Sequence, residues 1–436
     1  MYDIVAGTAD DLVRRIEDGV LAGALRSGET LPSVRALARD LDLSPTTIAK
    51  AYRELRRRGV VVTEDRARTV IAHRPQLRFR LAPTVPEGAV DLATGNPDGR
   101  LLPSLEHGVR SLPTAQYRYT DDVLLPALVD LARRAGAQDE LDARHLVVVG
   151  GGLDGIERVL EEHLRLGDRV GVEDPGYPGS LDLVRALGLE PVGIAVDAHG
   201  LVPEALDAAL AGGLTALLHV PRAQNPTGAA LSRSRAEQLR QRLADHPDLL
   251  VIEDDHAAPI AGVPAATLTT GRSRWAVVRS VAKWLGPQLR LGILLGDEAT
   301  TDRVLARQRL GVGWVSQLLQ HLVAVTWEQA ETDGTLQRAT AAYAERQQAL
   351  LAALATRGIT ATGRSGLNVW IPVDEEVPVV QGLAEQGWGV AAGEAFRLDS
   401  APGIRVTTAL LPPSDAADFA GALERVLEQR LTGRRG

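Results

Sequence analysis

Ser280, Lys283 and Arg290 are the polar centre of an otherwise apolar stretch, residues 276–296. Apolar runs of this length on both sides are typical of buried strands. Lysine occurs only at Lys50 and Lys283, so 46 of the 48 basic residues are Arg. Arg stays protonated, whereas Lys can lose its proton and condense with a carbonyl as a Schiff base. Lys283 is therefore a candidate for covalent chemistry; the alternatives are a surface lysine or the Ser-x-x-Lys pair of a serine acyl enzyme.

A second candidate follows the apolar run 249–252, which ends in three acids and His256. An Asp at a strand end, facing a buried ring nitrogen, would keep that nitrogen protonated, as a pyridinium cofactor requires. Asp254 is in this position. The alternative is a group of solvated acids in a loop. No second His lies at ligand spacing, so we expect no metal site.

Three more polar motifs follow apolar runs. Asn225 precedes a Pro, which favours an extended or turn conformation that presents its amide to a ligand hydroxyl. Residues 150–155 form a Gly-rich loop that opens a helix, and such loops offer backbone N–H groups to anions. Tyr177 supplies a ring that can stack on a flat cofactor. Taken singly, each motif also fits an ordinary turn, loop or core tyrosine.

Alternating apolar runs and amphipathic segments position these residues. Strands that alternate with helices predict an α/β domain whose mainly parallel, seven-stranded sheet is covered on both faces. Ligand sites in such sheets lie at the carboxyl ends of the strands. A smaller α+β unit is expected after the helical stretches around 301–330 and 335–357. The seven predicted strands are 146–149, 169–172, 192–196, 216–220, 249–253, 276–279 and 292–295.

Composition limits the class of protein. The chain has 436 residues, 45% of them hydrophobic, no Cys, and a net charge of −8. It has no apolar run of membrane-span length and no signal-peptide pattern, so we expect a soluble, cytoplasmic protein. Residues 1–75 carry 13 Lys or Arg and 11 Asp or Glu, which leaves the acidic excess to the rest of the chain. This asymmetry indicates a specialised N-terminal module.

The N-terminal module has three helical patterns. Residues 8–27 have apolar positions at helical spacing, Ser33 is a plausible N-cap for the second helix, and Ser44 with Pro45 begins the third. Two short helices joined by a tight turn are typical of a helix-turn-helix, and two short strands would form a wing. The alternative is a small helical domain with a solvated basic helix. The candidate DNA-contacting residues are Arg35, Ser44, Thr46, Thr47, Lys50 and Arg53.

Residues 10–72 resemble the winged-helix domain of the GntR family of bacterial repressors. The resemblance rests on Leu-Pro-Ser-Val-Arg, Ser-Pro-Thr-Thr and Ala-Tyr-Arg-Glu-Leu-Arg-Arg-Arg-Gly. It implies that Arg35, Ser44, Thr46, Thr47 and Lys50 face operator DNA. The family's wing usually has a Gly-x-Gly-Thr tip, and in this chain those glycines are Arg66 and Arg68. These arginines either grip the minor groove or give the wing another shape.

The remainder, about residues 90–430, resembles fold-type I aminotransferases, which bind pyridoxal 5′-phosphate. The motif order carries the resemblance: the Gly-rich loop, Asp-Pro-Gly-Tyr, Asn-Pro-Thr-Gly, Glu-Asp-Asp, Ser-x-x-Lys and Arg. It implies an internal aldimine at Lys283, and Arg405 as the clamp for a substrate carboxylate. His256 replaces the family's usual Tyr, and Leu124 replaces a usual Gly. The implied cofactor contacts are Asp254 to the ring nitrogen, Asn225 to the ring hydroxyl, Tyr177 to the ring face, Ser280, Arg290, Gly152 and Leu153 to the phosphate, and Tyr119 to the phosphate of a neighbouring subunit.

The two halves together resemble the MocR/GabR group of regulators. This resemblance implies a homodimer whose cofactor domain senses an amine, an amino acid or pyridoxal 5′-phosphate itself and sets the grip on the operator. The Arg-Ala-Gln-Asn-Pro-Thr-Gly segment and short linker are closer to members that govern vitamin B6 supply than to those that answer γ-aminobutyrate. Alternatives are a working aminotransferase and a DNA-binding protein with a structural, cofactor-free domain. The expected domains are 1–73 (winged helix), 74–88 (linker), 89–330 (cofactor domain) and 331–436 (small subdomain).

Overall fold

The computed structural model describes residues 7–21, 24–26, 28–57, 60–64, 68–71, 85–114, 118–119 and 121–433. An N-terminal module and a larger body each have a hydrophobic core of their own, and each is described by itself. Within these ranges, none of the helices combines the length and apolar character needed to cross a membrane.

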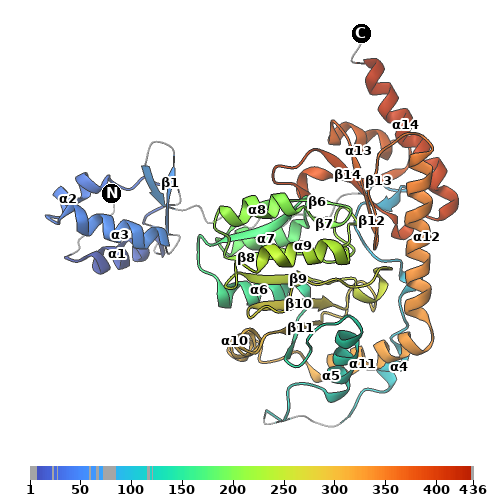
Figure 1. Ribbon diagram of the computed structural model, residues 1–436, viewed down its shortest axis with the longest axis horizontal. Helices are drawn as coiled ribbons and strands as arrows, with labels where there is room; N and C mark the ends of the chain where they lie inside the picture. Colours follow the sequence, from blue (N-terminus) through green and yellow to red (C-terminus); the bar gives the residue numbers. More distant parts are fainter. Residues whose placement is uncertain are drawn as a thin grey trace. The chain divides into compact units, whose positions relative to one another are not determined.

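The N-terminal module is the predicted winged helix-turn-helix (Figure 1). Its three helices pack around a core that includes Leu12, Ile16, Ile48, Tyr52 and Leu55, all completely buried. Strands β1 and β2 pair antiparallel and form the wing. Its elements are α1 (Ala9–Leu21), α2 (Val34–Asp40), α3 (Pro45–Arg57), β1 (Val61–Glu64) and β2 (Arg68–Ile71).

Local hydrogen bonds fix the ends of the two helices in the helix-turn-helix. Ser33 Oγ accepts from the backbone N–H of Ala36, and Ser44 Oγ accepts from that of Thr47, as the N-cap pattern predicts. The Tyr52 hydroxyl donates to the Pro32 carbonyl over 2.8 Å and ties α3 to the start of α2. The first helix ends at Leu21, earlier than its apolar pattern suggests, and residues 24–26 are not helical.

The larger body is built on a mixed sheet with strand order β4-β11-β10-β9-β8-β5-β6-β7. All seven predicted strands are present, and the two-residue β7 makes an eighth. Strands β5, β8, β9 and β10 run parallel, and β11 runs antiparallel to both β10 and β4. The bounds are β4 (Leu146–Val149), β5 (Arg169–Asp174), β6 (Glu190–Asp197), β7 (Gly200–Leu201), β8 (Ala216–His219), β9 (Leu250–Asp254), β10 (Trp275–Ser280) and β11 (Gly292–Gly296).

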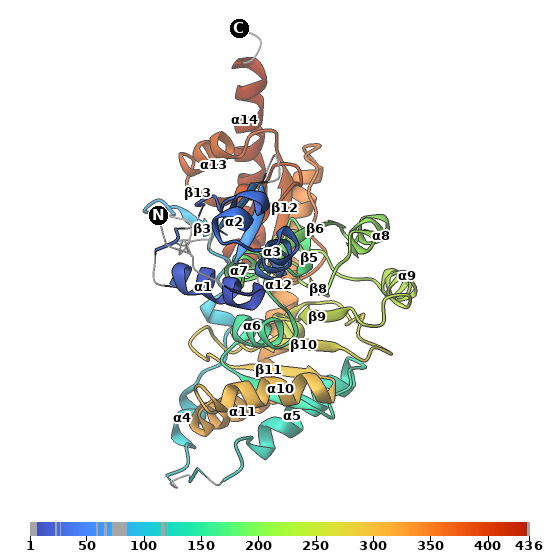
Figure 2. The same cartoon turned by 90° about the vertical axis from the view of Figure 1, so that its left-hand side faces the viewer.

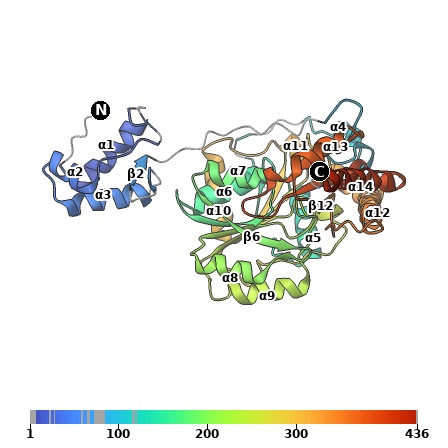
Figure 3. The ribbon, with the colours of Figure 1, turned by 90° about the horizontal axis from the view of Figure 1, so that it is seen from above.

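Helices cover both faces of this sheet. Figures 2 and 3 show α6 and α10 on one face and α8 and α9 on the other. The alternation along β10 explains how both faces are filled, because Val277 packs in the cluster with α5 and α11 while Val278 packs against Gly155 of α6. The helices are α4 (Glu106–Arg110), α5 (Pro126–Gln138), α6 (Gly152–His163), α7 (Pro178–Ala186), α8 (Pro203–Ala211), α9 (Arg233–Leu243), α10 (Glu298–Arg309) and α11 (Gln317–Thr332).

The small sheet has strand order β12-β14-β13-β3. Strand β3 (Val90–Leu92) comes from before the large sheet in the chain and pairs parallel with β13. Residues 90–92 therefore join the small sheet, although they fall in the range expected for the cofactor domain. The other elements are β12 (Asn368–Pro372), β13 (Trp388–Ala392), β14 (Gly403–Thr407), α12 (Thr335–Ala355), α13 (Glu376–Ala384), α14 (Ala416–Gly433) and the 3-10 turn η3 (Gly393–Phe396).

Candidate cofactor edge and candidate DNA-binding surface

One edge of the large sheet collects the polar motifs that follow its strands. Strands β4, β5, β8, β9 and β10 run in the same direction, so their carboxyl ends meet at this edge. We call it the cofactor edge. The residues that the structure brings to this edge are Gly152 and Leu153 after β4, Tyr177 after β5, Asn225 after β8, Asp254 and His256 at the end of β9, and Ser280, Lys283 and Arg290 between β10 and β11.

Lys283 is held in place by the core beside it. Val281, Trp284 and Leu285 are buried, and the Trp284 indole donates to the carbonyl of Ser280 over 2.9 Å. The Lys283 Nζ donates to the carbonyl of Gly95 at 2.5 Å. Burial lowers the Lys283 pKa to about 8, helped by the positive charge of Arg405 and opposed by Asp254. A larger share of this amine is therefore neutral near pH 7 than in an exposed lysine.

The neighbouring acids Asp254 and Asp255 face different partners. Asp255 forms ion pairs with Arg222 at 2.8 Å and with Arg279 at 3.0 Å. Burial would raise the Asp255 pKa, but these two positive charges outweigh it and hold the pKa at about 2. No arginine in the described ranges forms an ion pair with Asp254, and burial raises the Asp254 pKa. Asp255 is thus part of a buried ion network, and Asp254 is the acid available to a ligand.

Asp254 also gives the sharpest test of whether a pyridinium ring fits. Asp254 is 7% exposed, and its Oδ1 is buried without a hydrogen-bond partner among the described residues. Leaving such an oxygen unpaired costs about 1–3 kcal/mol or more, so native structures seldom retain one without a ligand or water. His256 Nδ1 lies 3.8 Å away, too far for a hydrogen bond. A protonated ring nitrogen is the partner that this carboxylate lacks, so the residues fit pyridoxal 5′-phosphate.

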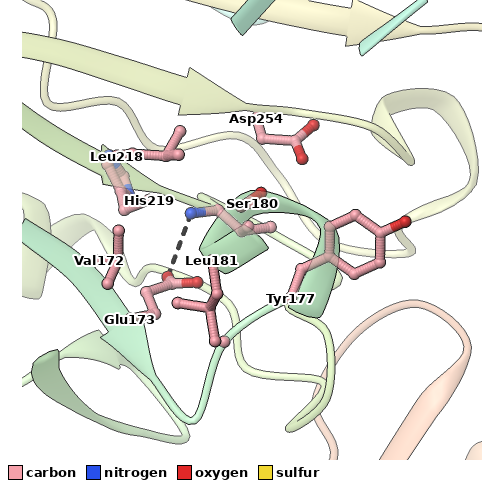
Figure 4. Close-up of a pocket in the computed structure, with 10 residues that line it drawn as sticks. Val172, Glu173, Tyr177, Ser180, Leu181, Leu218, His219 and Asp254 are labelled. Atoms are coloured by element: carbon pink, nitrogen blue, oxygen red, sulfur yellow. Dashed lines mark hydrogen bonds between the residues drawn. The ribbon is translucent and has the colours of Figure 1, made fainter. Parts of the chain in front are cut away.

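Tyr177 and Asp254 line the same pocket, as Figure 4 shows. Tyr177 is 37% exposed. Beneath it, Glu173 accepts from the backbone N–H of Val220 at 3.1 Å and from the Gln224 amide at 3.0 Å. Burial raises the Glu173 pKa to about 7, opposed by His219 and these hydrogen bonds. Glu173 and Gln224 are not among the residues predicted from the sequence, although their positions within the Glu-Asp-Pro-Gly-Tyr and Gln-Asn-Pro motifs offer a signal.

The Gly-rich loop opens the twelve-residue helix α6 and can receive an anion. A Cβ at Gly151 would come within 3.0 Å of the Arg290 guanidinium, and one at Gly152 within 3.4 Å of the Ser280 Cβ. These close approaches place a guanidinium and a hydroxyl beside the first N–H groups of α6. Because helix N-termini attract negative charge, this arrangement suits a phosphate.

Arg405 lies on β14 and joins the small sheet to the cofactor edge. Its side chain is 5% exposed, it donates to Asn225 Oδ1 at 3.2 Å, and it also donates to the carbonyl of Ala93. The guanidinium carbon lies 4.9 Å from the centre of the Phe396 ring. Its Nε is buried and has no hydrogen-bond partner in the part of the chain that the structure describes. Burial lowers the Arg405 pKa to about 10, and an incoming carboxylate would offset that cost.

Tyr119 is the one cofactor-edge prediction that lies apart. It is 93% exposed, with its ring edge-on to Trp314 at 5.8 Å, and it does not line the pocket beside Asp254. An exposed aromatic ring is consistent with a contact outside this chain. Its expected role in a second subunit therefore stays a prediction.

The N-terminal module presents its predicted residues on its surface. In α3, Thr46, Lys50 and Arg53 are exposed, and Thr47 is half-buried with its hydroxyl 2.8 Å from Ser44 Oγ. Small polar residues thus lie at the start of the helix and basic residues follow on it, as in a recognition helix. Arg66 lies outside the described residues. Arg35 at the start of α2, Ser44 before α3 and Arg68 on β2 are also exposed.

Comparisons with known proteins agree with both halves of the chain. Residues 8–71 match the family model for bacterial regulatory proteins of the GntR family, and residues 87–423 match that for class I and II aminotransferases. The vitamin B6 salvage pathway transcriptional repressor PtsJ of Salmonella typhimurium is 38% identical over 96% of this chain and 99% of its own length. The chain is a MocR-type regulator of the GntR family. Its larger domain has the fold of the pyridoxal 5′-phosphate-dependent aminotransferases.

Other relatives of this MocR-type regulator extend the same pattern. The pyridoxine biosynthesis regulator PdxR of Corynebacterium glutamicum is 28% identical and covers 72% of this chain and 71% of its own length. The α-aminoadipate aminotransferase LysN of Thermus thermophilus, solved with N-(5′-phosphopyridoxyl)-L-leucine, has a TM-score of 0.69 at 21% identity, covering 79% of this chain and 94% of its own. That likeness shows the fold of the large domain.

Proposed function

We propose that this regulator binds pyridoxal 5′-phosphate at the cofactor edge and that this binding changes its affinity for operator DNA. One observation carries the proposal. The amine of Lys283 and the unpartnered oxygen of Asp254 lie at the same sheet edge, in a chain that also has a GntR winged helix. The cofactor, when bound, would supply an aldehyde carbon for the lysine amine and an electron-withdrawing ring.

The chain's own residues would bind and orient this cofactor. Lys283 would attach it covalently, and Asp254 would keep the ring nitrogen protonated. Asn225 and His256 would contact the ring hydroxyl, and Tyr177 would stack on the ring. The phosphate would be held by Ser280, Arg290 and the N–H groups of Gly152 and Leu153, with Tyr119 of a second copy completing the site in a homodimer.

Arg405 indicates the class of effector. A nearly fully buried guanidinium that donates to a carbonyl and an amide oxygen suits a carboxylate. A ligand that joins an amine near Lys283 to a carboxylate near Arg405 would be an amino acid. The names of PtsJ and PdxR concern vitamin B6. We therefore propose cytoplasmic control of vitamin B6 genes, with pyridoxal 5′-phosphate itself as the signal and amino acids as further effectors.

The direct test measures DNA affinity and cofactor binding on the same preparation. Operator sequences would first be selected from random duplexes by the full-length protein. A ligand shifts DNA affinity only by the difference between its affinities for the two arrangements, which is typically about 5- to 150-fold. We expect pyridoxal 5′-phosphate to shift the operator Kd within that range. Tight cofactor binding with no change in Kd would contradict the proposal.

A second candidate function is transamination. It is favoured by the convergence of Lys283, Asp254 and Arg405, since these groups also serve an aminotransferase. Incubation of the cofactor-loaded protein with 2-oxoglutarate and a panel of amino acids tests it. Turnover near the ordinary enzyme range of about 1–1000 per second would support an enzyme, and its absence beside a DNA response would support a sensor.

A further inference from the structure

Lys283 and Arg405, two of the cations near the cofactor edge, both donate to one short turn. Lys283 Nζ donates to the carbonyl of Gly95, and Arg405 donates to the carbonyl of Ala93. These are the groups that would engage an aldehyde and a carboxylate. A ligand that binds either side chain would therefore compete with a carbonyl of the turn formed by residues 93–95.

Hydrogen bonds within this turn hold it together, so the carbonyls of Ala93 and Gly95 move together. Asp91 Oδ1 accepts from the backbone N–H groups of Ala93 at 3.0 Å and Thr94 at 2.9 Å, and the Thr94 hydroxyl donates to Asp91 Oδ2. Gly95 has φ +73°, a conformation that strains other residues, and a Cβ there would come within 3.4 Å of Arg405. Asp91 belongs to β3, so displacement of the turn also displaces that strand.

Phe396 and Val85 connect the turn of residues 93–95 to the segment that precedes β3. Ala93, Trp370, Ala391 and Phe396 form one buried cluster, and Val85 packs against it. Phe396 also lies under the Arg405 guanidinium, with 4.9 Å between its ring centre and Cζ. A Cβ on Gly389 would meet Val85 Cγ1 at 2.8 Å, so Val85 is seated directly on β13. Arg405 and Val85 therefore both contact this cluster.

Val85 is the first described residue after positions 72–84, which connect the winged helix to the body. Any signal carried along the chain to the DNA-binding module must pass this position. We infer that the turn of residues 93–95, with β3 and Val85, couples ligand binding at the cofactor edge to residues 72–84 and so to the DNA-binding module. The inference rests on the proposed function and names its regulatory element.

The geometry gives the change in operator affinity two contributions, one from the cofactor and one from a carboxylate ligand. Pyridoxal 5′-phosphate would release Gly95 from Lys283, and a carboxylate ligand would release Ala93 from Arg405. Since one braced turn holds both carbonyls, each ligand biases the same element and favours binding of the other. With the cofactor bound, L-alanine should change the operator Kd further, whereas ethylamine, which lacks the carboxylate, should change it at least about threefold less. Equal effects of the two amines would overturn this assignment of Arg405.

The decisive variants leave the cofactor contacts intact. Val85→Ala removes packing against Gly389 and the Phe396 cluster, and Val377→Ala is the matched control because Val377 is 56% exposed on α13. Cofactor affinity, followed by absorbance, should stay within about twofold of wild type in both. The change in operator Kd caused by pyridoxal 5′-phosphate should collapse toward one in Val85→Ala and persist in Val377→Ala.

Gly389→Ala tests the same element in the opposite direction. Its added methyl group would push Val85 away, so the ligand-free variant should have an operator Kd shifted toward the cofactor-bound value. Full coupling in Val85→Ala, or a ligand-free Kd unchanged in folded Gly389→Ala, would overturn the inference. A wild-type protein that binds pyridoxal 5′-phosphate without any change in operator Kd would instead overturn the proposed function, and this inference with it.

Discussion

The two lysines of this chain lie in regions that are built in different ways. Lys50 is exposed on α3, a helix whose start is capped by Ser44 from the adjacent turn. Lys283 lies at the cofactor edge and donates to Gly95, which is 188 positions away in the chain. The surroundings of Lys50 are formed by residues close to it in the chain. The surroundings of Lys283 are formed by the ends of five strands and by the small sheet.

This difference determines what each lysine can do. An exposed ammonium stays hydrated and protonated and contributes charge, as phosphate contacts require. Burial of Lys283 lowers its pKa to about 8 and gives it a neutral amine, as covalent attachment requires. Arg can replace a lysine in the first role and cannot in the second. The following predictions test that contrast.

The largest expected effect comes from replacing each lysine by Arg. Lys283→Arg keeps the charge but cannot attach the cofactor, so pyridoxal 5′-phosphate should no longer be retained after borohydride reduction and gel filtration. Its affinity should fall by about 100-fold, which corresponds to ~2.7 kcal/mol. Lys50→Arg should retain the cofactor fully and keep operator affinity within about threefold. Covalent retention of cofactor by Lys283→Arg would refute Lys283 as the anchor.

A smaller effect is expected on the DNA side. Thr47→Ala combined with Lys50→Ala removes one polar contact and one charge from α3, and should weaken operator binding by about 10- to 100-fold. The plot of log affinity against log salt should lose about one unit of slope, because one phosphate contact disappears. Cofactor absorbance should be unchanged. Intact operator binding with an unchanged slope would place the recognition surface elsewhere.

Asp254→Asn tests the proposed hydrogen bond between Asp254 and the cofactor's ring nitrogen, because Asn has nearly the same shape as Asp but no charge. Loss of a charge-assisted hydrogen bond should lower cofactor affinity by about tenfold, since such bonds contribute about 1.5–3 kcal/mol. The absorbance maximum of the bound cofactor should also shift, because the ring nitrogen would lose its proton. Asp418→Asn, an exposed residue on α14, is the control and should match wild type. A wild-type spectrum and affinity in Asp254→Asn would remove Asp254 from the site.

The last prediction concerns the pH dependence of cofactor attachment at Lys283. The neutral amine of Lys283 is the reactive form, and its lowered pKa of about 8 means that this form increases as the pH rises through 8. The rate of covalent cofactor incorporation should rise about tenfold per unit below pH 7.5 and level off above pH 8.5. Stopped-flow absorbance measures this rate directly. A midpoint near 10.5, the ordinary value of a lysine, would show that the site does not lower the pKa of Lys283.

The comparison also explains what the sequence could predict. The caps at Ser33 and Ser44 and the seven long strands were predictable because they depend on local residues and on apolar periodicity. The order of the motifs after the apolar runs also predicts Lys283, Asp254 and Asn225 at one sheet edge, where the structure has them. Their roles there remain proposals.

Other features depend on contacts between distant parts of the chain. The pairing of β3 with β13 and the donation from Lys283 to Gly95 join segments about 190–300 positions apart, which no local pattern specifies. The contrast between Asp254 and Asp255 likewise follows from Arg222 and Arg279, whose ion pairs exist only in the folded chain. The contacts of the turn formed by residues 93–95 with Lys283 and Arg405 likewise exist only in the folded chain.

The central claim is that a cofactor at Lys283 changes operator binding. The measurement that tests it most directly is the operator Kd of wild type and Lys283→Arg as pyridoxal 5′-phosphate is titrated, with cofactor absorbance recorded in the same samples. We predict a shift of about 5- to 150-fold in wild type, saturating together with the absorbance, and little or no shift in the variant. An operator Kd that stays constant while wild type fills with cofactor would contradict the account.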